Sequence, residues 1–146
     1  MNSGPPLEPG EQLLASARAS FRGATAATLR STAAFGSARV RNRAYEAWRG
    51  PVDAAGFPTV AADMLLDVTD RRIITYAPTF FGRRNSSSAR SLPLERIGEV
   101  ACVRHGLILG MAFALTDGPI IELEAMHMRR LRRFAGAVAQ QIAKRR

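Results

Sequence analysis

Residues 64–76, MLLDVTDRRIITY, decide the fold that we predict for this chain. Two short apolar runs, 64–68 and 73–76, flank the polar tetrad 69–72. Such runs around a short polar segment are typical of two strands joined by a tight turn. Thr and Asp side chains can hydrogen-bond to the backbone of the turn, while Arg71 and Arg72 keep its tip charged and in water. The stretch predicts a β-hairpin, but it indicates almost nothing about function.

Length and composition indicate one domain. The 146 residues, 47% of them hydrophobic, are enough for one sizeable core and too few for two ordinary domains. The single cysteine, Cys102, lies in an apolar run, and we interpret it as a buried hydrophobic side chain. The N-terminus lacks the features of a secretory signal, and the longest apolar run, 107–115, is too short to cross a bilayer. We expect a cytoplasmic protein, with peripheral attachment to the inner membrane face as a further possibility.

The apolar pattern predicts a mainly β chain. Residues 11–22 alternate between apolar and polar side chains, and Asp117 and Gly118 form a turn favoured by hairpins. Pro93 cannot donate to a sheet ladder, so its strand should lie at an edge or enter irregularly. In 107–115 we expect Leu107, Leu109 and the alternate residues after them to face the core. The seven predicted strands comprise residues 11–22, 64–68, 73–76, 91–97, 99–104, 107–115 and 120–124.

The remaining segments are expected to be less regular. Residues 1–10 are expected to form a flexible leader, and residues 82–90 an exposed, mobile loop. Between the first two strands we expect an inserted segment, 23–63. Within it, 28–35 is a possible short strand, and 37–49 favours a helix that ends at Gly50 and Pro51. A loop at 53–62 then returns the chain to the hairpin.

The period changes to that of a helix over residues 126–142. Its apolar side chains fall on one face, and burying each large one contributes roughly 1.5–3 kcal/mol. We therefore expect the helix to cover an open end of the sheet. This apolar face comprises Met128, Leu131, Phe134, Ala135, Val138 and Ile142.

The order of these motifs resembles the bacterial pleckstrin-homology-like domains and the related GRAM-like group. The likeness rests on residues 66–74, LDVTDRRII, on 92–97, LPLERI, and on the Thr-Asp-Gly turn before the last strand and helix. It covers roughly residues 11–22 and 64–142. The resemblance implies a domain over 11–146, with an open barrel of two nearly orthogonal sheets, the insertion at 23–63 and a capping helix at 126–143. Members of this superfold bind lipid headgroups, peptides or proteins, so the resemblance leaves the ligand open.

Catalytic, metal and cofactor sites are not indicated by the sequence. His105 and His127 have no nucleophile or carboxylate at a spacing used in catalysis, and no Gly-rich phosphate loop is present. Glu122 and Glu124 alternate with apolar residues, which favours the solvated face of the last strand. We therefore expect neither an enzyme nor a cofactor.

Positive charge is concentrated in two blocks. The net charge of +9 includes +6 on residues 18–49 and +7 on residues 127–146. At about 1 kcal/mol per arginine near an acidic membrane, four arginines supply roughly 4 kcal/mol, a weak attraction that needs a second contact. Solvated arginines on the helix surface, where cations suit the dipole of its C-terminal half, explain the pattern more simply, and no nucleic-acid motif accompanies them. The candidate residues for an anionic surface are Arg129, Arg130, Arg132 and Arg133, with Arg39, Arg41 and Arg43 in the insertion.

Protein association or self-association is the leading expectation from sequence. Tyr45, Trp48 and Phe57 exceed what a covering segment needs, and together they could form an exposed patch for a partner. If they are buried instead, Trp48→Ala should unfold the chain. The alternative is peripheral binding to anionic lipid headgroups through the arginines.

Overall fold

The structure, a computed structural model, describes residues 6–33, 38–125 and 127–146. The predicted hairpin is confirmed by β2 (Asp63–Thr69) and β3 (Arg72–Tyr76), which pair antiparallel with Val68 opposite Ile73. The Thr69 hydroxyl holds the turn, because it accepts hydrogen bonds from the backbone N–H groups of Arg71 and Arg72, each at 3.0 Å. A threonine at this position therefore stabilises the turn as the sequence predicts.

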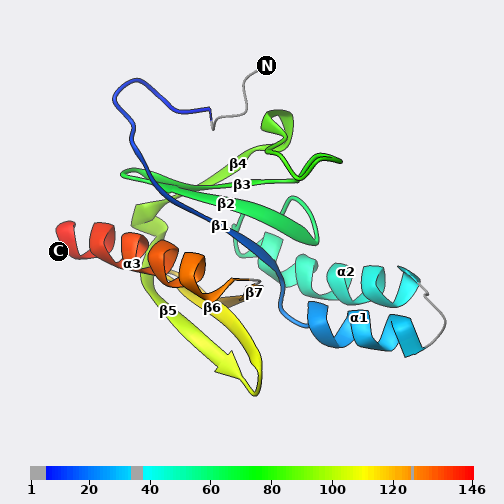
Figure 1. The fold of residues 1–146 in the computed structure, drawn as a ribbon. Helices are drawn as coiled ribbons and strands as arrows, with labels where there is room; N and C mark the ends of the chain where they lie inside the picture. Colours follow the sequence, from blue (N-terminus) through cyan, green and yellow to red (C-terminus); the bar gives the residue numbers. More distant parts are fainter. Residues whose placement is uncertain (1–5, 34–37, 126) are drawn as a thin grey trace.

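Within the described residues, seven antiparallel strands form one sheet in the order β4-β3-β2-β1-β7-β6-β5. The central strand β1 pairs with both β2 and β7 (Figure 1). The mainly β class with a C-terminal helix is thereby confirmed. The remaining strands are β1 (Leu13–Phe21), β4 (Arg90–Pro93), β5 (Ile97–His105), β6 (Ile108–Leu115) and β7 (Ile120–Ala125).

Three details of the strands differ from the prediction. The edge strand β4 stops at Pro93, and a 3₁₀ turn, η2 (Leu94–Arg96), separates it from β5. Leu107 does not face the core but is 99% exposed, because Gly106 adopts a φ of +63° and the turn carries Leu107 outward before β6 begins. Cys102 is also exposed, on edge strand β5, so its interpretation as a buried side chain is wrong.

Two helices occupy the segment between β1 and β2. The possible strand at 28–35 is wrong for residues 28–33, which belong to helix α1 (Ala24–Ala33), while 34 and 35 lie outside the described residues. Alanine favours this helix, and the Glu124 side chain supports its start by accepting hydrogen bonds from the backbone N–H groups of Gly23 and Thr25. The Glu124 side chain of β7 therefore favours a helix at α1, where the local sequence pattern leaves strand and helix undecided.

Helix α2 (Ala38–Ala54) begins where expected but does not end at Gly50 and Pro51. It continues because Val52 is buried in the core and Asp53 pairs with Arg90 of β4. These tertiary contacts offset the backbone hydrogen bond that Pro51 cannot donate. The expected loop follows from Ala55 to Ala62 without further helix or strand.

Helix α3 (Met128–Lys144) confirms the predicted amphipathic helix. It lies between the β1–β4 and β5–β7 parts of the sheet and contacts β1 and β5 (Figure 1). Leu131, Phe134, Val138 and Ile142 are buried in one core with side chains from both parts. In the described residues, no helix has both the length and the apolar character needed to cross a bilayer.

The described part of the N-terminal leader is held against the hairpin turn. The Arg71 side chain contacts Glu8, and Arg72 donates to the Pro6 carbonyl at 2.9 Å. Arg72 also pairs with the buried carboxylate of Glu11. The described part of the predicted flexible leader therefore contacts both arginines of the turn.

Candidate functional site

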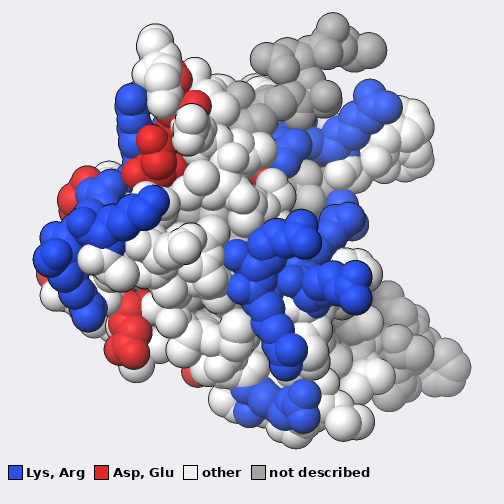
Figure 2. All heavy atoms as spheres, turned by 60° about the vertical axis from the view of Figure 1, so that its left-hand side comes forward, with Lys and Arg blue, Asp and Glu red and all other residues white. Residues whose placement is uncertain are grey.

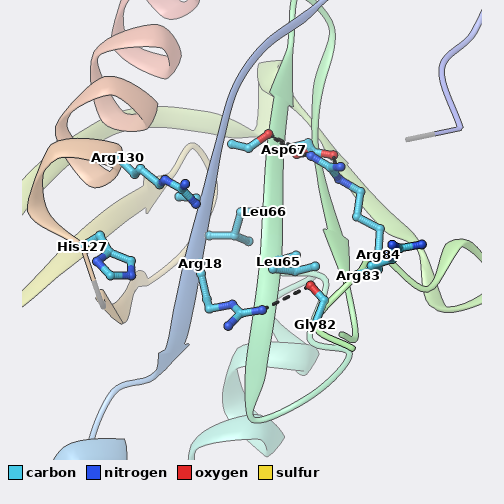
Figure 3. Close-up of a pocket in the computed structure, with 11 residues that line it drawn as sticks. Arg18, Leu65, Leu66, Asp67, Gly82, Arg83, Arg84, His127 and Arg130 are labelled. Carbon is cyan, nitrogen blue, oxygen red and sulfur yellow. Dashed lines mark hydrogen bonds and ion pairs between the residues drawn. The ribbon is translucent and has the colours of Figure 1, made fainter. Parts of the chain in front are cut away.

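A hollow of about 520 Å³ lies over strands β1 and β2 (Figure 3). Its walls come from three parts of the chain: the two strands, the turn at 82–84 and the start of α3. The charged side chains around it are Arg18, Asp67, Arg83, Arg84 and Arg130, with His127 beside them. Basic groups therefore dominate this site.

The alternation along β1 explains why polar groups reach this face. Ala15, Ala17 and Ala19 are buried against the core, so Ser16 and Arg18 between them point to the other side. Ser16 stands opposite Asp67 of β2 and donates a hydrogen bond to its carboxylate. The strand register thus brings a serine and an aspartate together at the floor of the hollow.

Asp67 is fully engaged by an arginine from the loop after β3. Arg84 donates from Nε and from one terminal nitrogen to the two Asp67 oxygens, at 2.7 and 2.8 Å, and that carboxylate is 1% exposed. This hydrogen-bonded pairing also favours the charged form of Arg84 and raises its pKa above the ordinary value. The expected mobile loop at 82–90 is accordingly fixed at Arg84, because a two-pronged buried ion pair ties it to β2.

The other cations around the hollow are not neutralised in this way. Arg18 donates to the Gly82 carbonyl at 3.3 Å, and Arg130 extends from α3 toward β1 (Figure 3). Arg83 lies at the exposed rim. Among the residues that the structure describes, no carboxylate forms an ion pair with any of these three arginines. Figure 2 shows one area of the surface where Lys and Arg side chains gather with no acidic side chain among them, while Asp and Glu lie beside basic groups elsewhere in the view.

Three arginines without a paired carboxylate among the described residues favour the binding of an anion in the hollow. At about 4 Å, a unit charge attracts a guanidinium by roughly 1 kcal/mol in water and by about 4 kcal/mol near a protein surface. Guanidinium groups also match the oxygen geometry of phosphate. The hollow can therefore hold a phosphate or another oxyanion through charge-assisted hydrogen bonds.

The four arginines of α3 are exposed but do not form one site. Only Arg130 lines the hollow beside Arg18. Arg132 lies beside Cys102 and Leu109 of the neighbouring strands, while Arg133 lies along the helix toward Leu14. Arg129 is exposed and lines none of these three hollows.

The arginines of the insertion also separate. Arg41 pairs with Asp63 at 2.9 Å and lies 5.6 Å from the centre of the Phe21 ring, so it helps to hold α2 against the sheet. Arg39 and Arg43 are exposed on α2 and do not line the hollow around Arg130. The structure thus selects one arginine from each sequence block, Arg18 and Arg130, as the pair beside the hollow.

The aromatic side chains proposed as a partner patch are engaged in the fold. Phe57 is fully buried, with its ring 5.6 Å from that of Phe113. Tyr45 and Trp48 are half-buried and pack on the buried ring of Phe21. An exposed patch of these three residues is therefore wrong, because two of them fasten α2 to β1 and the third belongs to the core.

Among the described residues, an exposed aromatic pair lies elsewhere, at the tip of the loop after β3. Phe80 and Phe81 are 97% and 84% exposed, and their ring centres are 5.3 Å apart. A second hollow, of about 700 Å³, lies between Phe80 and Leu29 of α1 and shares Arg18 with the first. Sequence reasoning missed this pair, although two aromatic residues directly before a Gly-Arg-Arg loop were a visible signal.

The two carboxylates of β7, Glu122 and Glu124, have structural partners. Burial opposes the charge of Glu124, yet hydrogen bonds from the Thr25 and Gly23 backbone and from the Arg22 side chain lower its pKa. Glu124 is buried and caps α1, so its placement on a solvated face is wrong. His105 meets Glu122 at 3.1 Å on the surface. Across the described ranges, no group of three His, Cys, Asp or Glu side chains is placed to hold a metal ion.

Comparison of the chain with protein-family models gives no match, and neither does comparison with curated proteins.

Proposed function

We propose that this protein is a non-catalytic binding module that takes an anionic, phosphate-bearing ligand at the hollow over β1 and β2. The observation that carries the proposal is the approach of Arg18 and Arg130 to one hollow from separate elements, with Arg83 at its rim and no carboxylate paired to them in the described residues. Asp67, the acidic side chain there, is already neutralised by Arg84. A ligand phosphate would supply the negative charge that these arginines lack.

The proposed architecture is the pleckstrin-homology-like one. In it, β1–β4 and β5–β7 form two nearly orthogonal halves of an open barrel, and α3 closes the gap between them. The number and order of the strands and the position of the helix support this assignment. Residues 23–63 are then an insertion of two helices between the first two strands.

Association through Tyr45, Trp48 and Phe57 is not part of the proposal. Those rings contact Phe21 and Phe113 of the same chain. The anionic ligand is preferred because, in the described residues, no carboxylate neutralises Arg18 and Arg130 beside the hollow.

The test is calorimetric titration with two soluble probes, inorganic pyrophosphate and a short-chain phosphatidic acid below its micelle concentration. We expect Arg18→Ala and Arg130→Ala each to weaken binding about tenfold or more, since a hydrogen bond to a charged group contributes roughly 1.5–3 kcal/mol net of its exchange with water. The matched control is Arg43→Ala, which removes an exposed arginine of α2 that does not line the hollow. An equal loss in all three variants, or no binding by the unaltered protein, would contradict the proposal.

A further inference from the structure

We propose that the Phe80-Phe81 tip inserts into the interfacial layer of an anionic lipid bilayer while Arg18, Arg83 and Arg130 bind the headgroups. This inference rests on the proposed function, because it names the source of the anionic ligand as a membrane surface. The partner follows from the chemistry of one face, on which an exposed aromatic pair lies next to the arginines of the hollow.

The tip is a hydrogen-bonded turn that holds both rings outward. Thr79 N–H donates to the Arg83 carbonyl at 2.7 Å, and Gly82 N–H donates to the Thr79 carbonyl at 2.8 Å. Gly82 has a φ of +74°, a conformation that glycine adopts readily. The rings are therefore presented to solvent by an ordered backbone, at the cost of leaving two large apolar side chains in water.

The turn is also fixed to the hollow. Arg18 of β1 donates to the Gly82 carbonyl, and Arg84 is tied to the buried Asp67 carboxylate of β2. Pro78 and Arg84 pair across the base of the loop. The aromatic tip and the arginines consequently keep a constant spacing, so a single flat surface can meet both.

The surroundings of the tip continue its apolar and cationic character. Leu29 of α1 is 67% exposed and lines the second hollow with Phe80. The two carboxylates of that hollow are paired within the fold, Asp63 with Arg41 and Glu124 with Arg22. In the described residues, every carboxylate that lines either hollow therefore has a cationic partner, and none is left to repel a negative surface.

An anionic bilayer satisfies both features at once. Aromatic rings prefer the boundary between headgroups and acyl chains, and nearby basic side chains gain from the negative surface potential. Neither feature alone gives stable attachment, whereas an apolar anchor combined with a basic patch does. A single-stranded nucleic acid would also stack its bases on exposed rings beside arginines, and the quenching of a tryptophan at position 81 by brominated lipids distinguishes the bilayer from it.

The experiment is co-sedimentation with vesicles of phosphatidylcholine alone or mixed equally with phosphatidylglycerol. The test variant is Phe80→Ala with Phe81→Ala, and the control is Leu107→Ala, which removes an equally exposed apolar side chain from the β5–β6 turn. We expect the double variant to lower the partition coefficient on the anionic vesicles about tenfold or more, because it loses the favourable transfer of both rings from water into the apolar layer. Leu107→Ala should stay within about twofold of the unaltered protein, since Leu107 lines neither of the two hollows.

A second measurement reports insertion directly. The tryptophan fluorescence of Phe81→Trp and Leu107→Trp is compared on anionic vesicles that contain brominated lipids. The signal of Trp48, measured in the unaltered protein, is subtracted from both. We expect quenching for the tryptophan at position 81 and none for that at 107. Equal quenching of both, or of neither, would overturn the inference.

The outcomes separate this inference from the proposed function. If the Phe80/Phe81 variant binds vesicles as the unaltered protein does, while Arg18→Ala and Arg130→Ala reduce binding of pyrophosphate, the tip has no membrane role and the anion site stands. If the arginine variants change neither vesicle nor pyrophosphate binding, the proposed function fails. Absence of vesicle binding, or equal binding to neutral vesicles, contradicts the bilayer as the source of the ligand.

Discussion

At the scale of single residues, the hairpin turn depends on Glu11. Its buried carboxylate accepts hydrogen bonds from Arg72 at 2.9 Å and from the Thr69 hydroxyl at 2.7 Å. The Arg72 hydrogen bond outweighs desolvation and lowers the pKa of Glu11 from 4.5 to about 2. Because the folded pKa is depressed, this carboxylate stabilises the fold fully above pH 4.5 and loses that contribution as the pH falls toward 2.

Glu11→Gln should therefore reduce the free energy of unfolding by about 2 kcal/mol at neutral pH, since it leaves Arg72 without its anion. The difference from the unaltered protein should shrink between pH 4.5 and about 2, where the native carboxyl is itself protonated. Urea denaturation at a series of pH values measures this. A difference that does not change over that window would show that Glu11 acts by packing alone.

At the scale of elements, replacing either of two glycines by alanine should have opposite effects on stability. A Cβ on Gly110 of β6 would lie 2.3 Å from the Leu123 carbonyl oxygen of β7, whereas one on Gly136 of α3 would meet no atom within 4 Å. Gly110→Ala should destabilise the protein by about 2–3 kcal/mol, because the strands must separate. Gly136→Ala should stabilise it by up to about 1 kcal/mol through helix propensity. Thermal denaturation tests both, and a neutral Gly110→Ala would mean that β6 and β7 are less closely apposed than described.

The elements also show what sequence can and cannot predict. The hairpin and α3 carry strong periodic patterns, and their contacts are made by the residues that form the pattern, so both were predictable. Helix α1 begins at a carboxylate about 100 residues away in sequence, and α2 continues through Pro51 because Val52 is buried by distant strands. Such determinants lie outside any local window. For the same reason Arg130 was predictable as an exposed arginine, but its approach to Arg18 required the packing of α3 on β1.

At the scale of the whole molecule, the net charge of +9 attracts any anionic surface, and salt screens that attraction. Insertion of apolar rings is not screened. The unaltered protein should therefore retain part of its vesicle binding at high salt, whereas the Phe80/Phe81 variant should lose nearly all of it. Parallel salt titrations of the two proteins measure the difference, and superimposable curves would count against insertion.

The most direct measurement of the central claim is side-chain NMR of the arginine Nε–H groups during titration with inorganic pyrophosphate. If the hollow over β1 and β2 is the anion site, the signals of Arg18 and Arg130 shift and saturate together, while those of Arg39 and Arg43 on α2 remain in place. Small shifts spread over all exposed arginines without saturation would contradict the account, because they would show an ionic atmosphere around a basic surface and no site.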